Sequence, residues 1–141
     1  MCIRDRSMAC IDFEQLRDLP LVLPTRNHGL RRTLEHAATQ ADMPLNVAFE
    51  IDALELMKEI VVEGLAHTVL GLPAVIKEVA AGQLIARRIT HPGLSTRLML
   101  ATASSRPMTQ AVKIVQAMLR EVLAQMTAEA PYREGMRMVP D

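Results

Sequence analysis

Thr25, Arg26 and Asn27 bring a hydroxyl group, a cation and an amide into one short stretch of the chain. They follow the apolar run 21–23, which is typical of a buried strand, and they precede apolar residues at helical spacing. The free N–H groups and the dipole of a helix N-terminus favour an anion. We therefore expect a carboxylate ligand held by the Thr25 hydroxyl, nearby amides and Arg26. The alternative is that Thr25 and Asn27 only cap the helix and that Arg26 is solvated.

A second group of polar side chains, Glu63, His67 and Thr68, lies where a helix is expected to end and a strand to begin. His67 and Thr68 can donate hydrogen bonds to a ligand. An unperturbed histidine also titrates at a pKa of about 6.5, so His67 can respond to pH. The alternative is a structural histidine at the start of a strand, bonded to the backbone.

Metal binding and catalysis have little support in the spacing of the remaining reactive residues. His28 and His36 lie two helical turns apart rather than one, and the HExxH pattern is absent. The GxSxG nucleophile elbow and the glycine patterns of nucleotide-binding loops are absent as well. The sequence therefore predicts no metal, no cofactor and no enzyme activity, and a small α/β enzyme is the third-ranked alternative.

The composition argues against several functional classes. The 141 residues include 16 Lys and Arg and 16 Asp and Glu, so the chain lacks the basic surplus of a duplex-binding module. Lys77, Arg87 and Arg88 are expected on a solvated face. The two cysteines, Cys2 and Cys10, favour a reduced compartment, and no apolar run approaches the ~20 residues of a membrane span. We expect a cytoplasmic protein without a membrane partner.

Short apolar strands alternate with amphipathic helices along most of the chain. This alternation is typical of an α/β fold in which helices cover a parallel sheet, and such sheets bind ligands at the carboxyl ends of their strands. The last strand and helix follow a turn at 91–93 and have no obvious partner layer. The expected strands are 21–23, 47–51, 68–72, 84–90 and 97–102, and the expected helices begin near residues 25, 52, 73 and 109.

Residue types at the helix ends refine this order. Asp52 and Glu55 have the spacing of a capping box. Gly64 is expected to end the helix that follows them, and Pro73 is suited to the first turn of the next helix. Thr109 is a suitable N-cap for the longest helix.

Three stretches have an order and spacing typical of one protein family. They are LPLVLPTRNHGLRRTLEHA (19–37), EIDALELMKEIVVEGLAHTVLGLPAVIKEVAAGQLIARRI (50–89) and LSTRLMLATASSRPMTQAVKIVQAMLREVL (94–123). They resemble the C-terminal effector-binding domain of LysR-type transcriptional regulators, over about residues 11–126. Within them, EGLAHTVLGLPAV (63–75) looks like the family's G-L-G-x-x-x-L-P-x segment. Ala66 and Gly71 depart from the pattern, because the family often has Gly and Pro there.

The resemblance implies a two-lobed domain, similar to periplasmic binding proteins of type 2, that holds a small anionic metabolite between its lobes. The second lobe would be complete, with a parallel-rich sheet flanked by helices, and the first lobe only partial. Glu63, His67 and Thr68 would face the cleft near the hinge and would contact the effector together with Thr25, Arg26 and Asn27. The intact bacterial regulator would bind DNA through an N-terminal helix-turn-helix outside this chain, as a homodimer or tetramer.

The same resemblance sets the expected domain limits. Residues 1–7, MCIRDRS, show no structural period and are interpreted as a non-native leader. Residues 8–90 would form the second lobe, 91–128 the return strand and helix of the first lobe, and 129–141 a loose tail. The alternative function is a fragment of a periplasmic-type solute-binding protein.

Overall fold

The computed structural model of this chain describes residues 10–102, 105, 107–129 and 132–139. The chain divides into two compact units, Met1–Thr96 and Arg97–Asp141. The leader expected at 1–7 lies outside the described residues, as does Cys2.

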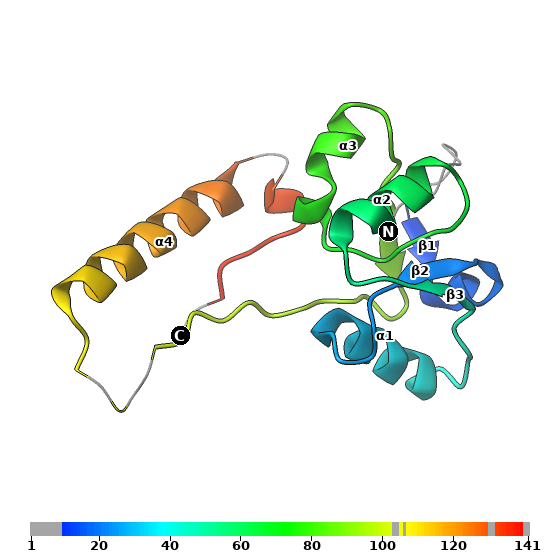
Figure 1. The fold of residues 1–141 in the computed structure, drawn as a ribbon, viewed down its shortest axis with the longest axis horizontal. Coiled ribbons are helices and arrows are strands. Elements are labelled where there is room, and N and C mark those ends of the chain that lie inside the picture. The colour runs from blue at the N-terminus through cyan, green and yellow to red at the C-terminus, as the bar shows by residue number, and fades with distance from the viewer. Residues whose placement is uncertain (1–9, 103–104, 106, 130–131, 140–141) are drawn as a thin grey trace. The chain divides into compact units, whose positions relative to one another are not determined.

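The first unit is a mixed arrangement of short strands and helices (Figure 1). Alternate residues of one strand pack on opposite sides: Leu21 and Leu23 join a cluster with Leu34, whereas Val22 packs with Met57. The strands therefore separate two helical layers. Its elements are β1 (Cys10–Asp12), η1 (Phe13–Asp18), β2 (Leu21–Leu23), α1 (Gly29–Gln40), β3 (Val47–Glu50), α2 (Leu54–Val62), η2 (Leu72–Ala74), α3 (Ile76–Ala80) and β4 (Arg88–Thr90).

The strand pairing in this unit is parallel, as the sequence predicts. β2 pairs with β3, and β1 pairs with β4. A further parallel bridge joins Leu21 to His67, so the segment around His67 extends the β2–β3 pair. The expected α/β class with parallel strands is therefore confirmed.

Two of the expected strands are wrong. Within 68–72 only Thr68 has the geometry of a bridge residue, and Leu72 already begins η2. Pro73, next to it, cannot donate a ladder hydrogen bond and is better suited to the start of a helix. The segment 97–102 is also not a strand. Its Leu98 and Met99 side chains are largely exposed, and a strand without a partner has nothing to pair with.

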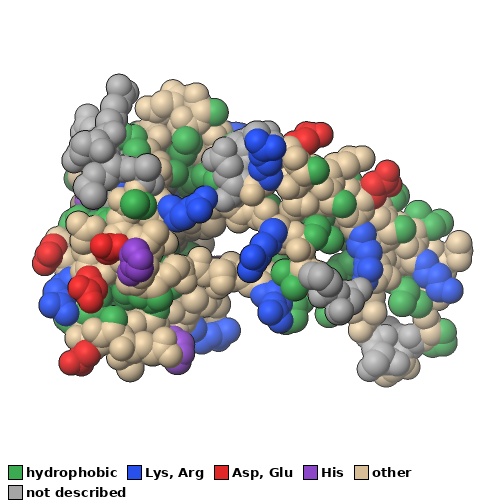
Figure 2. All heavy atoms as spheres, turned by 180° about the vertical axis from the view of Figure 1, so that it is seen from behind, with side chains coloured by type: hydrophobic (Ala, Val, Ile, Leu, Met, Phe, Trp, Pro, Cys, Tyr) green, Lys and Arg blue, Asp and Glu red, His purple; other side chains and the backbone are tan. Residues whose placement is uncertain are grey.

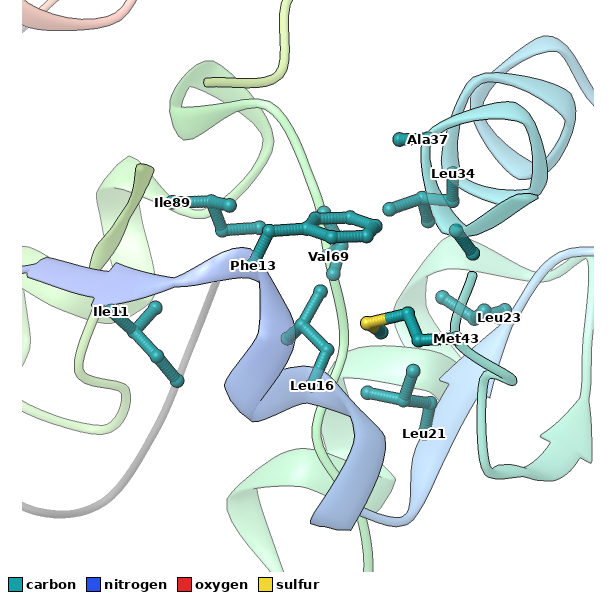
Figure 3. Close-up of a cluster of buried hydrophobic side chains, with 11 residues drawn as sticks. Ile11, Phe13, Leu16, Leu21, Leu23, Leu34, Ala37, Met43, Val69 and Ile89 are labelled. Carbon is teal, nitrogen blue, oxygen red and sulfur yellow. The ribbon is translucent and has the colours of Figure 1, made fainter. Parts of the chain in front are cut away.

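The N-terminal segment contributes to the main hydrophobic core, although its sequence shows no strand or helix pattern. Phe13 and Leu16 have no exposed surface, and both come from η1. Figure 3 shows the Phe13 ring pointing toward Leu34 of α1. β1 brings Ile11 to the same cluster and holds it there by pairing with β4.

Helix ends agree with the expectations in part. The N-cap of α1 is His28, whose Nδ1 accepts the Leu30 N–H at 3.2 Å, rather than Thr25 or Asn27. Ala53 precedes α2, so the capping box expected from Asp52 is also wrong. In contrast, Gly64 adopts a φ of 74° just after α2, as expected for a terminating glycine.

The buried position of Arg87 contradicts the expectation of a solvated face. Arg87 is 6% exposed, and within the described residues its Nε and Nη2 atoms have no hydrogen-bond partner. Arg87 immediately precedes β4 and lies two residues before Ile89, which belongs to the core.

The second unit consists mainly of α4 (Gln110–Ala128), followed by η3 (Tyr132–Glu134). Thr109 caps α4 as predicted, since its Oγ1 accepts the Val112 N–H at 3.3 Å. Most apolar residues of α4 are exposed within this structure, whereas Leu123 and Met126 are half-buried. Figure 2 shows hydrophobic and basic side chains interspersed on this unit. The tail expected to be loose contains a short helical turn, in which the Tyr132 carbonyl accepts from Gly135 and Met136.

Candidate functional site

The register of β2 and β3 brings Thr25 opposite Asp52. Leu23 pairs with Glu50, and the Ile51 N–H donates to the Leu23 carbonyl at 2.9 Å. Thr25 and Asp52 each lie two residues beyond this pair. They therefore meet at the carboxyl edge of the two parallel strands, which is where open α/β sheets bind ligands.

Thr25 uses both of its hydrogen-bond donors on the Asp52 carboxylate. The backbone N–H donates to Oδ1 at 2.9 Å, and the hydroxyl group lies 3.1 Å from both Oδ1 and Oδ2. Hydrogen bonds to an ionised carboxylate are roughly twice as strong as neutral ones. Thr25 thus binds a carboxylate in this structure, and the carboxylate belongs to the protein itself.

Arg31 fixes the strand ends below this pair. Its side chain is 4% exposed, and its Nη1 donates to the Pro24 carbonyl at 3.3 Å and lies 3.1 Å from a Glu50 oxygen. Its Nε donates to Glu35 at 3.0 Å. One guanidinium group therefore joins the end of β2, the end of β3 and α1, which a single rigid fork of donors permits.

Arg26 and Asn27 lie beside Thr25 and face solvent. The Arg26 side chain is 78% exposed, and its Nε is 3.5 Å from a Glu35 oxygen, so this ion pair is weak. The Asn27 side chain is exposed as well, and its backbone carbonyl accepts from Arg32 at 3.4 Å. Both side chains are accessible to a ligand at this edge.

The second predicted group lies at the other end of the parallel strands. His67 is level with Leu21, so about 13 Å of extended chain separates the levels of His67 and Thr25. Glu63 lies further back and is exposed. The structure therefore brings Thr25, Arg26 and Asn27 together but does not bring Glu63 and His67 to them.

His67 and Thr68 are held mainly by the fold. The His67 N–H donates to the Pro20 carbonyl, and its own carbonyl accepts from Val22, both at 2.8 Å. Thr68 has no exposed surface, and its hydroxyl group has no partner among the described residues. Solvent does not reach this hydroxyl group in this structure.

Asp52 and Arg31 are site residues that the sequence pattern does not reveal. The spacing of Asp52 to Glu55 predicts a helix cap and not a contact with Thr25. The available signal was its position: Thr25 and Asp52 stand at similar offsets after two expected parallel strands. Nothing in the sequence separates Arg31 from an exposed arginine of the same helix, and only its burial in the structure does so.

A separate polar cluster lies at the carboxyl ends of β1 and β4. The Thr90 hydroxyl donates to Asp12 Oδ1 at 2.7 Å, and His91 Nδ1 is 2.9 Å from the same oxygen. The hydrogen bond from His91, and then that from Thr90, holds the pKa of Asp12 below its ordinary value of 3.8. His91 has an unusual positive φ of 48°.

Within the described part of the chain, no group of three His, Cys, Asp or Glu side chains could hold a metal ion. None of the helices in that part is both long and apolar enough to cross a membrane.

Comparison with known proteins identifies the family. Residues 6–124 match the LysR substrate binding domain. The chain belongs to this family. The LysR family consists of transcriptional regulators rather than enzymes, and its substrate-binding domain has a periplasmic-binding-protein-like fold of type 2.

A curated relative of this LysR domain is the HTH-type transcriptional regulator BbuR of Bordetella bronchiseptica. The two sequences are 34% identical over 97 residues, which cover 69% of this chain and 30% of the relative. The chain therefore aligns with less than a third of that regulator.

Proposed function

We propose that this chain is the effector-sensing domain of a bacterial LysR-type transcriptional regulator and that it binds a small anionic metabolite between two lobes. Its family membership and its identity to a regulator support sensing in transcription control. The whole protein would act in the cytoplasm, as a homodimer or tetramer, and would bind DNA through a helix-turn-helix in another part of its sequence.

The observation that supports an anionic effector is the contact between Thr25 and the Asp52 carboxylate. The N–H and hydroxyl groups of Thr25 converge on Asp52 with good geometry, so this edge of the sheet accepts a carboxylate. Arg26 and Asn27 add an accessible cation and an accessible amide beside it. We assign the effector carboxylate to these three residues.

Glu63, His67 and Thr68 have a different place in this proposal. The resemblance to the family implies that their segment faces the cleft. Glu63 is exposed, and His67 is half-buried. We assign them to a second part of the effector, away from its carboxylate. Thr68 can contribute only if the second lobe opens around it.

Effector binding regulates DNA binding only if the effector has different affinities for two arrangements of the protein. A factor of ten in operator affinity corresponds to about 1.4 kcal/mol of coupling between the two sites. The effector carboxylate, held at the ends of β2 and β3, would supply this difference by contacting both lobes in the closed arrangement only.

The test is the operator affinity of the complete gene product. Fluorescence anisotropy with the DNA upstream of the gene would be measured with and without a panel of carboxylate metabolites. We expect at least one carboxylate to change the affinity tenfold or more. If no metabolite changes it, or if a signal peptide in place of a helix-turn-helix precedes this domain in the gene, the proposal is wrong.

A further inference from the structure

The Thr25 donors are occupied before any effector arrives. Oδ1 of Asp52 receives the backbone N–H at 2.9 Å and shares the hydroxyl group with Oδ2. An effector carboxylate would need these same two donors, and each is a single hydrogen. Asp52 and the effector therefore compete for one position.

The ends of β2 and β3 around Thr25 form a frame that is held together without Asp52. Arg31 joins Pro24, Glu35 and Glu50, and the Ile51 N–H donates to Leu23 independently. These contacts hold the ends of β2 and β3 together when Asp52 leaves Thr25. The competing carboxylate is thus a movable side chain on a fixed frame.

Asp52 has little else to hold it. The cations at this edge already have carboxylate partners, because Arg26 faces Glu35 and Arg31 faces Glu35 and Glu50. Within the described residues, no cation lies within ion-pair distance of Asp52, and its side chain is exposed. Release of Asp52 therefore breaks only its contacts to Thr25 and returns a carboxylate to water.

The geometry points to Asp52 as a built-in competitor that the effector carboxylate must displace from Thr25. This inference rests on the proposed function, because it takes the effector to be a carboxylate bound at Thr25. Displacement also frees the turn between β3 and α2 from the turn between β2 and α1.

The size of the effect follows from the fraction of molecules in which Thr25 is free. The apparent dissociation constant equals the intrinsic one divided by that fraction. If Thr25 is free in about a tenth of the molecules, removal of Asp52 tightens carboxylate binding about tenfold.

The test is an NMR titration of the 141-residue chain with acetate, followed at the Thr25 amide. The proteins are the unaltered chain, Asp52→Ala and Asp52→Asn, which keeps the shape but loses the charge. Glu59→Gln is the matched control, because it removes one exposed negative charge from α2 without touching Thr25. Amide spectra of the core residues Leu21 and Leu23 verify folding. If Asp52→Ala is unfolded, Asp52→Asn decides.

We expect acetate to bind the Asp52 variants about tenfold more tightly than the unaltered chain and the Glu59→Gln control. Equal or weaker binding overturns the inference. Absence of binding by the folded variants also overturns it, because the freed donors would then not accept an external carboxylate. In that case the sensing role is still decided separately, by the response of operator affinity to metabolites.

Discussion

Arg31 makes the most extensive polar contacts of any residue near the candidate site. Its guanidinium group bonds three partners from different elements, and its side chain is almost completely buried. Arginine is always charged, so loss of its partners would leave a buried charge without compensation, and removal of Arg31 itself would leave the buried Pro24 carbonyl without this hydrogen bond.

Replacement of Arg31 by Met is therefore expected to lower the free energy of unfolding by about 1–3 kcal/mol. The estimate is below that for a fully buried pair, because Glu35 and Glu50 are partly exposed and can be solvated. Urea unfolding followed by circular dichroism measures the change. Arg32→Met, on an exposed neighbour, is the control and should change the free energy by less than about 0.5 kcal/mol.

The N-cap of α1 provides a second test at the residue scale. Since His28 accepts the Leu30 N–H, His28→Ala should lower the free energy of unfolding by about 1 kcal/mol. Asn27→Ala should have almost no effect, because the Asn27 side chain does not cap α1. The opposite order of the two urea midpoints would show that Asn27 is the cap in solution.

At the scale of elements, a partly buried ion pair between Lys58 and Glu78 joins α2 to α3. Lys58 Nζ lies 2.6 Å from a Glu78 oxygen and 2.8 Å from a Glu55 oxygen. The hydrogen bond from Lys58 lowers the pKa of Glu78 below 4.5. Hydrogen bonds to Glu55 and then Glu78 raise the pKa of Lys58 above 10.5.

These two shifts predict how Glu78→Gln changes the pH dependence of stability. Because the pKa of Glu78 is lowered, its carboxylate stabilises the fold above the unfolded pKa of 4.5, and this stabilisation is lost as the pH falls through the folded pKa. Because the pKa of Lys58 is raised, its ammonium group stabilises the fold below the unfolded pKa of 10.5, and this stabilisation is lost as the pH rises through the folded pKa. Glu78→Gln should therefore destabilise the chain most between these limits and least near pH 3.

Urea midpoints of the unaltered chain and Glu78→Gln, measured at about pH 3, 7 and 9, give this comparison. Glu59→Gln serves as the control, since Glu59 is exposed. If the difference in urea midpoint between Glu78→Gln and the unaltered chain does not decrease at pH 3, the ion pair between Lys58 and Glu78 does not form.

Elements with a continuous pattern could be predicted from sequence, and those defined by distant partners could not. The strand at 21–23 is a pure apolar run, and α4 shows a helical period over its whole length. β1 and η1 show neither, because Ile11, Phe13 and Leu16 stand singly among charged residues. Their place is set by pairing with β4, 78 residues away at Asp12 and Thr90.

The candidate site follows the same rule. Thr25, Arg26 and Asn27 could be predicted as a candidate site because a strand followed by a helix start is a local signal. The contact between Thr25 and Asp52 joins residues 27 positions apart and depends on the register of β2 and β3. Register depends on which residues of the two strands pack on the same neighbours, and neither strand shows this pairing by itself.

At the scale of the whole molecule, burial is concentrated in one of the two compact units. The buried residues among those described run from Ile11 to Ile89, and α4 contributes none. A chain that ends at Thr96 should therefore keep its core.

We expect this shortened chain to unfold cooperatively, with a free energy of unfolding within about 0.5 kcal/mol of that of the first unit in the full chain. Amide hydrogen exchange at Leu21 and Leu23 reports on this core directly. Loss of protection at these amides after the truncation would show that the second unit supports the first.

The central claim is that Thr25 binds the carboxylate of an effector. Its most direct test is calorimetric titration of the complete regulator with the carboxylate that changes its operator affinity. Thr25→Ala is compared with Thr39→Ala, which removes a hydroxyl group at the far end of α1. We predict that Thr25→Ala weakens binding about tenfold or more, from the loss of a hydrogen bond to a charged group, and that Thr39→Ala leaves binding unchanged. Equal affinity of the two variants would contradict the account.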